Sequence, residues 1–228
     1  MGKKEEIISW LTLGLTILAI YLALIYAPFI NEPKLIPRVA QKIFYFHVPG
    51  AWVGFLAFLV VFVCSIAFLK TSDRRYDSVA QVSAEIGVVF STITLITGPI
   101  WGKAAWGAWW DWGEPRLVTF LVLWLLYLGY IILNRSVGED FRRARYAAVF
   151  GIVAFIDVPI VFLSVRWYRT VHPGQPILES GGLSPQMKVA FFLSLFVFTV
   201  LYYLILRMRL SLYNLEEELK ELKERMEE

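Results

Sequence analysis

The chain has 228 residues, of which 58% are hydrophobic, 16% are aromatic and 18% are charged. A soluble domain of this length does not need so much apolar side chain, so the composition indicates a membrane protein. The formal net charge is only +3 and no Lys/Arg-rich run is present, which argues against nucleic acid as a partner.

Six apolar stretches are long enough to cross a bilayer, which takes about 20 residues. They cover approximately residues 7–28, 50–69, 82–101, 117–134, 146–165 and 188–207. We therefore predict an all-α, polytopic integral membrane protein whose six transmembrane helices form one domain over residues 1–210. No small-residue cleavage site follows the first stretch, so we expect a retained helix and not a signal peptide. The single cysteine, Cys64, lies in the second stretch and is expected to pack in the core.

Lys and Arg are distributed unevenly between the two sets of loops. Eleven lie near the N-terminus, around the loops at 70–81 and 135–145, and at the end of the sixth stretch; eight lie around the loops at 29–49, 102–116 and 166–187. Cytoplasmic loops carry the excess of positive charge. We therefore predict that both termini are cytoplasmic and that the second set of loops faces outward.

The first outward loop contains His47, one of only two histidines in the chain. It is followed by Val48, Pro49 and Gly50. Proline suits the first turn of a helix, so we place His47 just outside the start of the second helix. A lone loop histidine is usually a polar surface residue, but imidazole is also the commonest side-chain ligand for metals.

Five tryptophans occupy the twelve residues that begin the second outward loop, from Trp101 to Trp112. Trp prefers the membrane interface, but an aromatic belt explains one or two such residues better than five. If this stretch is helical, Trp106, Trp109 and Trp110 share one face. We expect these rings and Trp112 to stack against a large, planar, apolar ligand.

The fifth stretch contains Asp157, a carboxylate inside the predicted membrane. Such residues are costly and indicate a pairing or functional role, and we favour a structural one. His172 follows this stretch and lies on the same predicted side as His47. Two imidazoles can ligate a haem iron from both faces, whereas zinc is less favoured because no cysteine or third histidine is available.

Cations on the outward side fit the two propionates of a haem, because an Arg guanidinium pairs well with carboxylates. Ordinary contact with lipid headgroups is the alternative for each of them. The candidates are Arg116, Arg166 and Arg169, with Lys103, Lys42 and Arg38 behind them.

The C-terminal residues 211–228 differ from the rest of the chain. Leucines and a methionine recur at alternating spacings of three and four amid Glu and Lys, at Leu212, Leu215, Leu219, Leu222 and Met226. This is a heptad pattern. It predicts either a cytoplasmic amphipathic helix that docks on a partner or a solvated extension of the sixth helix.

Four segments resemble the haem-handling membrane proteins of bacterial cytochrome c maturation, and among them the haem exporter C family. They are residues 46–52 (FHVPGAW), 97–102 (TGPIWG), 106–112 (WGAWWDW) and 164–172 (SVRWYRTVH). The resemblance extends to about residue 207. The family's tryptophan segment often ends in a Trp-Asp pair followed by a cation, and here Glu114 is taken to replace the aspartate and Arg116 to be the cation.

The resemblance implies a binding protein, not an enzyme, that holds non-covalent haem b at the periplasmic face of the cell inner membrane. It implies His47 and His172 as axial ligands and Trp106, Trp109, Trp110 and Trp112 along the haem edge. The implied partners are a periplasmic haem chaperone, ATP-binding-cassette transporter subunits and a small single-helix membrane protein.

Two other functions remain as alternatives. A bis-histidine electron carrier generally needs haems near both membrane faces, whereas this chain has histidines on one predicted side only. A permease subunit without haem usually has ionisable residues or broken helices along its spans, and here Asp157 is the main example.

Overall fold

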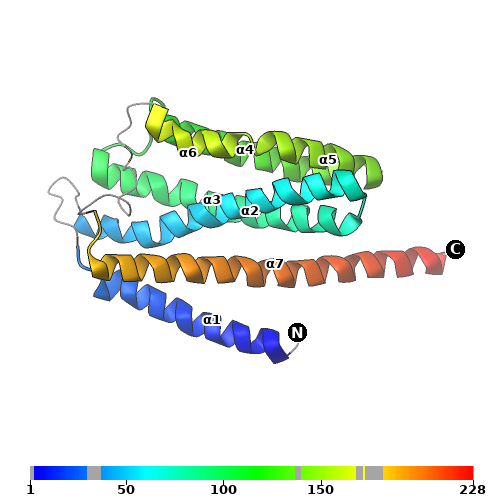
Figure 1. Cartoon of the computed structure of the whole chain (residues 1–228), viewed down its shortest axis with the longest axis horizontal. Coiled ribbons are helices and arrows are strands. Elements are labelled where there is room, and N and C mark those ends of the chain that lie inside the picture. Colours follow the sequence, from blue (N-terminus) through cyan, green and yellow to red (C-terminus); the bar gives the residue numbers. More distant parts are fainter. Residues whose placement is uncertain (1–2, 30–36, 137–139, 168–171, 173–181, 228) are drawn as a thin grey trace.

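The computed structural model describes residues 3–29, 37–136, 140–167, 172 and 182–227 (Figure 1). Those residues form helices and connecting turns, and no strand is found among them. The α-helices are α1 (Lys3–Tyr21), α2 (Phe44–Thr71), α3 (Arg74–Trp106), α4 (Pro115–Ser136), α5 (Asp140–Ala154), α6 (Asp157–Trp167) and α7 (Pro185–Glu227). A π-helical turn, η1 (Leu22–Tyr26), extends α1, and a 3₁₀-helix, η2 (Arg38–Ile43), leads into α2.

Six helical stretches within the described ranges are long and apolar enough to cross a membrane, which confirms the predicted six-span architecture. Their bounds are Glu6–Tyr26, Arg38–Thr71, Arg74–Trp106, Pro115–Arg135, Phe141–Ser164 and Pro185–Tyr213. The helices lie roughly side by side, and the first and last described residues are at the same end of the bundle (Figure 1).

Helix α2 begins at Phe44, earlier than predicted, so the placement of His47 outside this helix was wrong. Pro49 lies inside the helix and cannot donate a backbone hydrogen bond to the preceding turn. Aromatic packing holds the first turn in place: Phe44 stacks on Phe191 of α7 with ring centroids 5.1 Å apart, and Tyr45 is fully buried.

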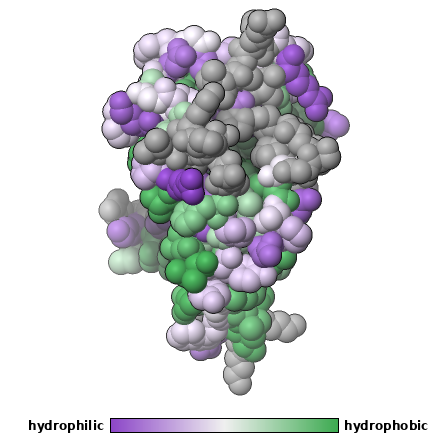
Figure 2. Space-filling view, turned by 90° about the vertical axis from the view of Figure 1, so that its left-hand side faces the viewer, coloured by the Kyte–Doolittle hydropathy of each residue, from purple (hydrophilic) through white to green (hydrophobic). Residues whose placement is uncertain are grey.

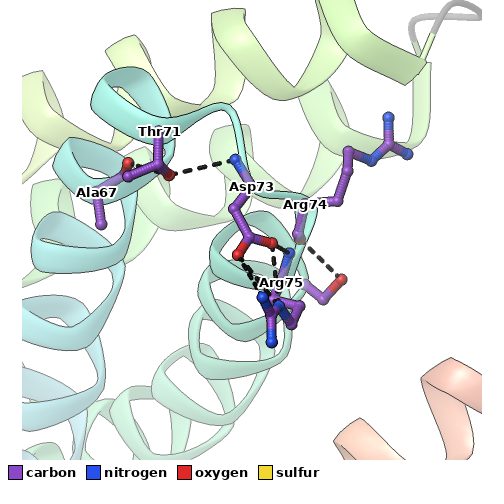
Figure 3. A network of polar contacts seen from close by, with 6 residues as sticks. Ala67, Thr71, Asp73, Arg74 and Arg75 are labelled. Atoms are coloured by element: carbon purple, nitrogen blue, oxygen red, sulfur yellow. Dashed lines mark hydrogen bonds and ion pairs between the residues drawn. The ribbon is translucent and has the colours of Figure 1, made fainter.

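Helix α3 begins at Arg74, eight residues before the predicted boundary at 82, because the turn after α2 provides a helix cap (Figure 3). Ser72 adopts a left-handed conformation (φ 58°), and Asp73 Oδ1 accepts a hydrogen bond from the backbone N–H of Arg75 at 3.0 Å. The Arg75 guanidinium also binds the Asp73 carboxylate, and these hydrogen bonds hold the pKa of Asp73 below its usual value. The first turns of α3 contain charged residues, so the length of the apolar stretch did not predict where the helix starts.

The fifth span is interrupted at residues 155–156, between α5 and α6, where one continuous helix was predicted. Pro159 has no N–H for the carbonyl of Phe155. That carbonyl instead accepts from the backbone N–H of Val158 at 3.0 Å, which tightens the chain at the break. Asp157 is the first residue of α6, where a negative charge is favoured by the helix dipole.

Helices α2 and α3 form the most extensive helix pair and pack closely through small residues. A Cβ added to Gly87 would lie 2.5 Å from Phe58 Cε1, and one added to Gly54 would lie 2.7 Å from Ser91 Oγ. Phe58 in turn stacks on Tyr127 of α4 with ring centroids 3.6 Å apart. Helices α4, α5 and α7 pack directly on this α2–α3 pair.

Helix α7 packs across this pair and then leaves the bundle. Inside the bundle, Tyr202 Oη and Ser83 Oγ are 2.7 Å apart. Beyond Tyr213 the helix continues without a break to Glu227 (Figure 1). The heptad residues Leu212, Leu215, Leu219, Leu222 and Met226 are all exposed. The predicted tail is therefore a continuous extension of α7, and docking on a partner stays a prediction.

Candidate functional site

A cavity of about 530 Å³ lies where α2, α4 and α7 begin and where α3 and α6 end. This is the left-hand end of the bundle in Figure 1, and Figure 2 looks onto it, with hydrophilic side chains spread among apolar ones. Apolar and aromatic side chains make up most of the lining. The polar exceptions are Gln41, His47, Thr94, Arg116 and His172.

His47 lines the cavity from the first turns of α2 and is held against α3. Its Nδ1 lies 2.9 Å from Thr97 Oγ1. Gly98 provides the room beside the ring, since a Cβ added there would lie 3.2 Å from His47 Cε1. The imidazole is therefore oriented by a hydroxyl and by the absence of a neighbouring side chain.

His172, which follows α6 in the chain, lines the same cavity. Its ring centroid lies 6.3 Å from that of Trp106, with the two planes inclined at 62°. Arg116, like His172, lines the cavity that His47 lines. The fold thus brings the chain's two histidines to the wall of one cavity, together with a guanidinium and an indole.

The tryptophan segment consists of the end of α3 and a loop, so the condition for one shared helical face, a helix through Trp110, is not met. Helix α3 stops after Trp106 because Gly107 adopts φ 80°, a left-handed conformation that glycine tolerates. The Gly107 carbonyl accepts from Lys103 Nζ at 2.8 Å. Trp109 and Trp110 therefore lie in the loop and not on the helix.

A turn built on Asp111 completes this loop. Asp111 Oδ1 accepts from the backbone N–H of Gly113 at 2.8 Å, and Glu114 is buried immediately before Pro115, the first residue of α4. The assignment of Glu114 as the counterpart of the family's aspartate, and of Arg116 as its cation, stays a prediction.

Three of the four predicted tryptophans line the cavity, namely Trp106, Trp109 and Trp110, and Trp101 joins them. The Trp110 side chain has a buried Nε1–H without a hydrogen-bond partner among the described residues. Trp112 is 73% exposed and instead lines a separate cavity of about 330 Å³ together with Trp167. The indoles thus divide between the wall of the main cavity and the outer surface.

Only some of the predicted cations line the cavity. Arg116 lines the cavity from the first turn of α4. Arg166 is exposed in α6 and is not part of the lining, and Arg169 lies outside the described residues. Lys42 is buried, donates to the carbonyl of Ala27 and lies over the ring of Phe29.

Several lining residues had no signal in the sequence. Phe44, Phe55, Phe120 and Phe162 come from three different helices and are ordinary apolar positions until the helices are assembled. Thr97 lies within one of the segments that carry the family resemblance, but its contact with His47 depends on the packing of α2 against α3.

Comparison with known proteins gives a consistent result. The sequence profile of the family described as "Heme exporter protein C" matches residues 2–227. The chain is 35% identical to a protein of that description from Bradyrhizobium diazoefficiens over 164 residues, which are 72% of this chain and 61% of the relative. It is 30% identical to the Haemophilus influenzae protein of that description over 221 residues, which are 96% of this chain and 88% of the relative.

A third relative, the heme exporter protein C of Escherichia coli strain K12, is 32% identical over 162 residues. That match covers 71% of this chain and 65% of the relative. The matched part of the chain therefore spans less than two thirds of the Bradyrhizobium and Escherichia proteins and most of the Haemophilus one.

Proposed function

Because this chain belongs to the heme exporter protein C family, we propose that it binds haem in the cavity at the tryptophan-rich end of the bundle. One observation carries the proposal: both histidines of the chain line that cavity. Imidazole is a common axial ligand of haem iron. His47 and His172 are therefore assigned as the two residues that hold the iron.

The other lining residues fit a large planar cofactor. Ligand pockets typically enclose ~300–1,000 Å³ and are mostly apolar with a few polar groups, and a cavity of about 530 Å³ lies within this range. Trp106, Trp109 and Trp110 supply flat apolar surface. They exclude water and favour a macrocycle over a small polar ligand.

Two groups suit the carboxylates of haem. Arg116 lines the cavity and carries a guanidinium that pairs with carboxylates. The buried Nε1–H of Trp110 has no partner among the described residues and is available to donate. Arg116 and Trp110 are therefore the proposed contacts of the propionates.

We further propose that the bound haem is non-covalent haem b and is presented at the periplasmic face of the cell inner membrane. The recipient is a periplasmic haem chaperone, and the protein works beside ATP-binding-cassette subunits and a small single-helix membrane protein. The family membership supports this role, and so does the position of the cavity at the end of the bundle away from the N- and C-termini. In this account the protein holds and presents haem and catalyses no reaction.

The two alternatives are less well supported. Electron transfer across a bilayer needs cofactors near both faces, and the histidines of this chain lie at one end of the bundle. A permease needs a polar route along the span, and the lining of the cavity is mostly apolar.

Hemin titration tests the proposed function. The purified full-length protein in detergent is expected to bind one hemin with a shifted Soret band. The variant His47→Ala/His172→Ala is expected to lose that shifted band. A matched control is Trp10→Phe, an exposed position on α1 far along the chain from the site, which is expected to bind as the wild type does. Unchanged binding by the double variant would exclude the two histidines as ligands.

A further inference from the structure

The hydroxyl of Thr97 has three polar neighbours that together define its role. Its Oγ1 lies 2.8 Å from the backbone carbonyl oxygen of Ile93, one helical turn earlier, 3.4 Å from that of Thr94, and 2.9 Å from His47 Nδ1. A threonine hydroxyl carries a single hydrogen and also accepts through its lone pairs. A carbonyl oxygen can only accept, so the short contact with Ile93 is satisfied when the hydrogen of Thr97 lies on it, and we assign the hydrogen to that bond.

The position of the Thr97 hydrogen determines which tautomer of His47 is present. With its own hydrogen on the Ile93 carbonyl, Thr97 Oγ1 accepts from His47, and Nδ1 of the imidazole therefore carries the proton. In a neutral imidazole the other nitrogen, Nε2, then has the free lone pair. A lone pair is what a metal ligand must present.

We propose that Thr97 is a positioning residue that fixes His47 as the tautomer with Nε2 ready to bind iron. Gly98 also contributes, because the absence of a side chain at this position leaves room for the edge of the His47 ring at Cε1. The inference rests on the proposed function for the identity of the metal, but the tautomer itself is a property of the protein without haem. A group that accepts a hydrogen bond from the second ring nitrogen of a ligating histidine fixes its tautomer and orientation and raises its basicity.

The tautomer can be measured directly. The full-length protein is labelled with ¹⁵N-histidine and examined by NMR without haem at about pH 8, above the ordinary histidine pKa of ~6.5. Only two histidines contribute signals, and the variant His172→Gln assigns them. The wild type and Thr97→Ser are expected to carry the His47 proton on Nδ1. Thr97→Val, which has no acceptor, is expected to lose that preference.

Hemin binding provides the second readout. Loss of such a partner typically weakens metal binding by ~10–100-fold, so Thr97→Val is expected to weaken hemin binding to that extent, while Thr97→Ser stays close to the wild type. The potential of the bound haem is expected to rise in Thr97→Val, because a less basic imidazole stabilises ferric iron less well.

Thr92→Val is the matched control for a general structural effect. Thr92 lies on the same helix as Thr97 but is not part of the cavity lining. Its Oγ1 donates to the Val88 carbonyl at 2.7 Å and accepts a hydrogen bond from Trp124 Nε1–H at 2.8 Å. This variant is expected to keep the His47 tautomer and the hemin affinity.

Two results would overturn the assignment of Thr97: a wild-type His47 with its proton on Nε2, or identical tautomer and affinity in Thr97→Val and the wild type. The proposed function fails separately. If the wild type binds no hemin, haem binding is excluded, and the NMR comparison still decides whether Thr97 fixes the tautomer.

Discussion

Gly98 and His47 are so close that the site depends on a missing methyl group. A Cβ at position 98 would lie 3.2 Å from His47 Cε1, which is tighter than most contacts of a Cβ, so the imidazole would have to shift. The hydrogen bond to Thr97 limits that shift, because the ring is held at Nδ1 on the same side.

Gly98→Ala is expected to separate binding from stability. Alanine favours a helix over glycine by about 1 kcal/mol, so α3 itself is not weakened. Hemin affinity is expected to fall by about tenfold or more, since a displaced ligand loses its geometry. Gly14→Ala, at a helical site with nothing within 4 Å of the added Cβ, is the matched control for titration and thermal unfolding. Equal hemin affinity in Gly98→Ala and the wild type would show that His47 has more freedom than the structure gives it.

Residue types alone were enough to single out His47, His172 and the tryptophan segment as candidates, because these side chains are scarce or unusually dense in the sequence, and most of them line one cavity. They were not enough for Thr97 and Gly98. These two residues matter only because α2 lies against α3, and a threonine or glycine in an apolar helix is common. The different positions of Trp110 and Trp112 also depended on the turn at Asp111.

Among the helices, α2 and α3 determine where the site lies. Their close approach depends on Gly87, where a Cβ would lie 2.5 Å from one atom of Phe58 and 2.9 Å from another. Phe58 cannot easily move, since its other face stacks on Tyr127. The pair must therefore separate if a side chain is added at position 87.

Gly87→Ala is expected to destabilise the protein by about 1–3 kcal/mol, the usual cost of overpacking a core. Unfolding in detergent micelles, followed by circular dichroism, measures this change. The variant Gly14→Ala again serves as the control, because its added methyl group meets open space. A Gly87→Ala protein as stable as the wild type would mean that the α2–α3 contact is looser than described.

The six spans could be predicted because bilayer thickness imposes a minimum apolar length on each helix. Their ends could not be predicted in the same way. Helix α3 starts in a charged segment because Asp73 caps it, and α2 continues through Pro49 because its first turn is packed against α7. The break before α6 follows from Pro159, which leaves the Phe155 carbonyl without its usual helical donor, although the apolar pattern predicted one continuous stretch.

In the whole molecule, the cavity is formed by segments that are distant in sequence. His47 belongs to α2, the indoles belong to α3 and the loop after it, and His172 follows α6. An even number of spans places the N- and C-terminal ends together at the opposite end of the bundle (Figure 1). Which end is cytoplasmic stays a prediction from the modest excess of Lys and Arg at that opposite end.

The central claim is that His47 and His172 hold one haem iron between them, and electron paramagnetic resonance of the ferric complex tests it most directly. Two imidazole ligands give low-spin iron, whereas the loss of one ligand favours a high-spin form. The hemin-loaded wild type is expected to give a low-spin spectrum, and His47→Ala and His172→Ala are each expected to give a high-spin one. A low-spin spectrum that persists in either single variant would contradict the assignment of that histidine.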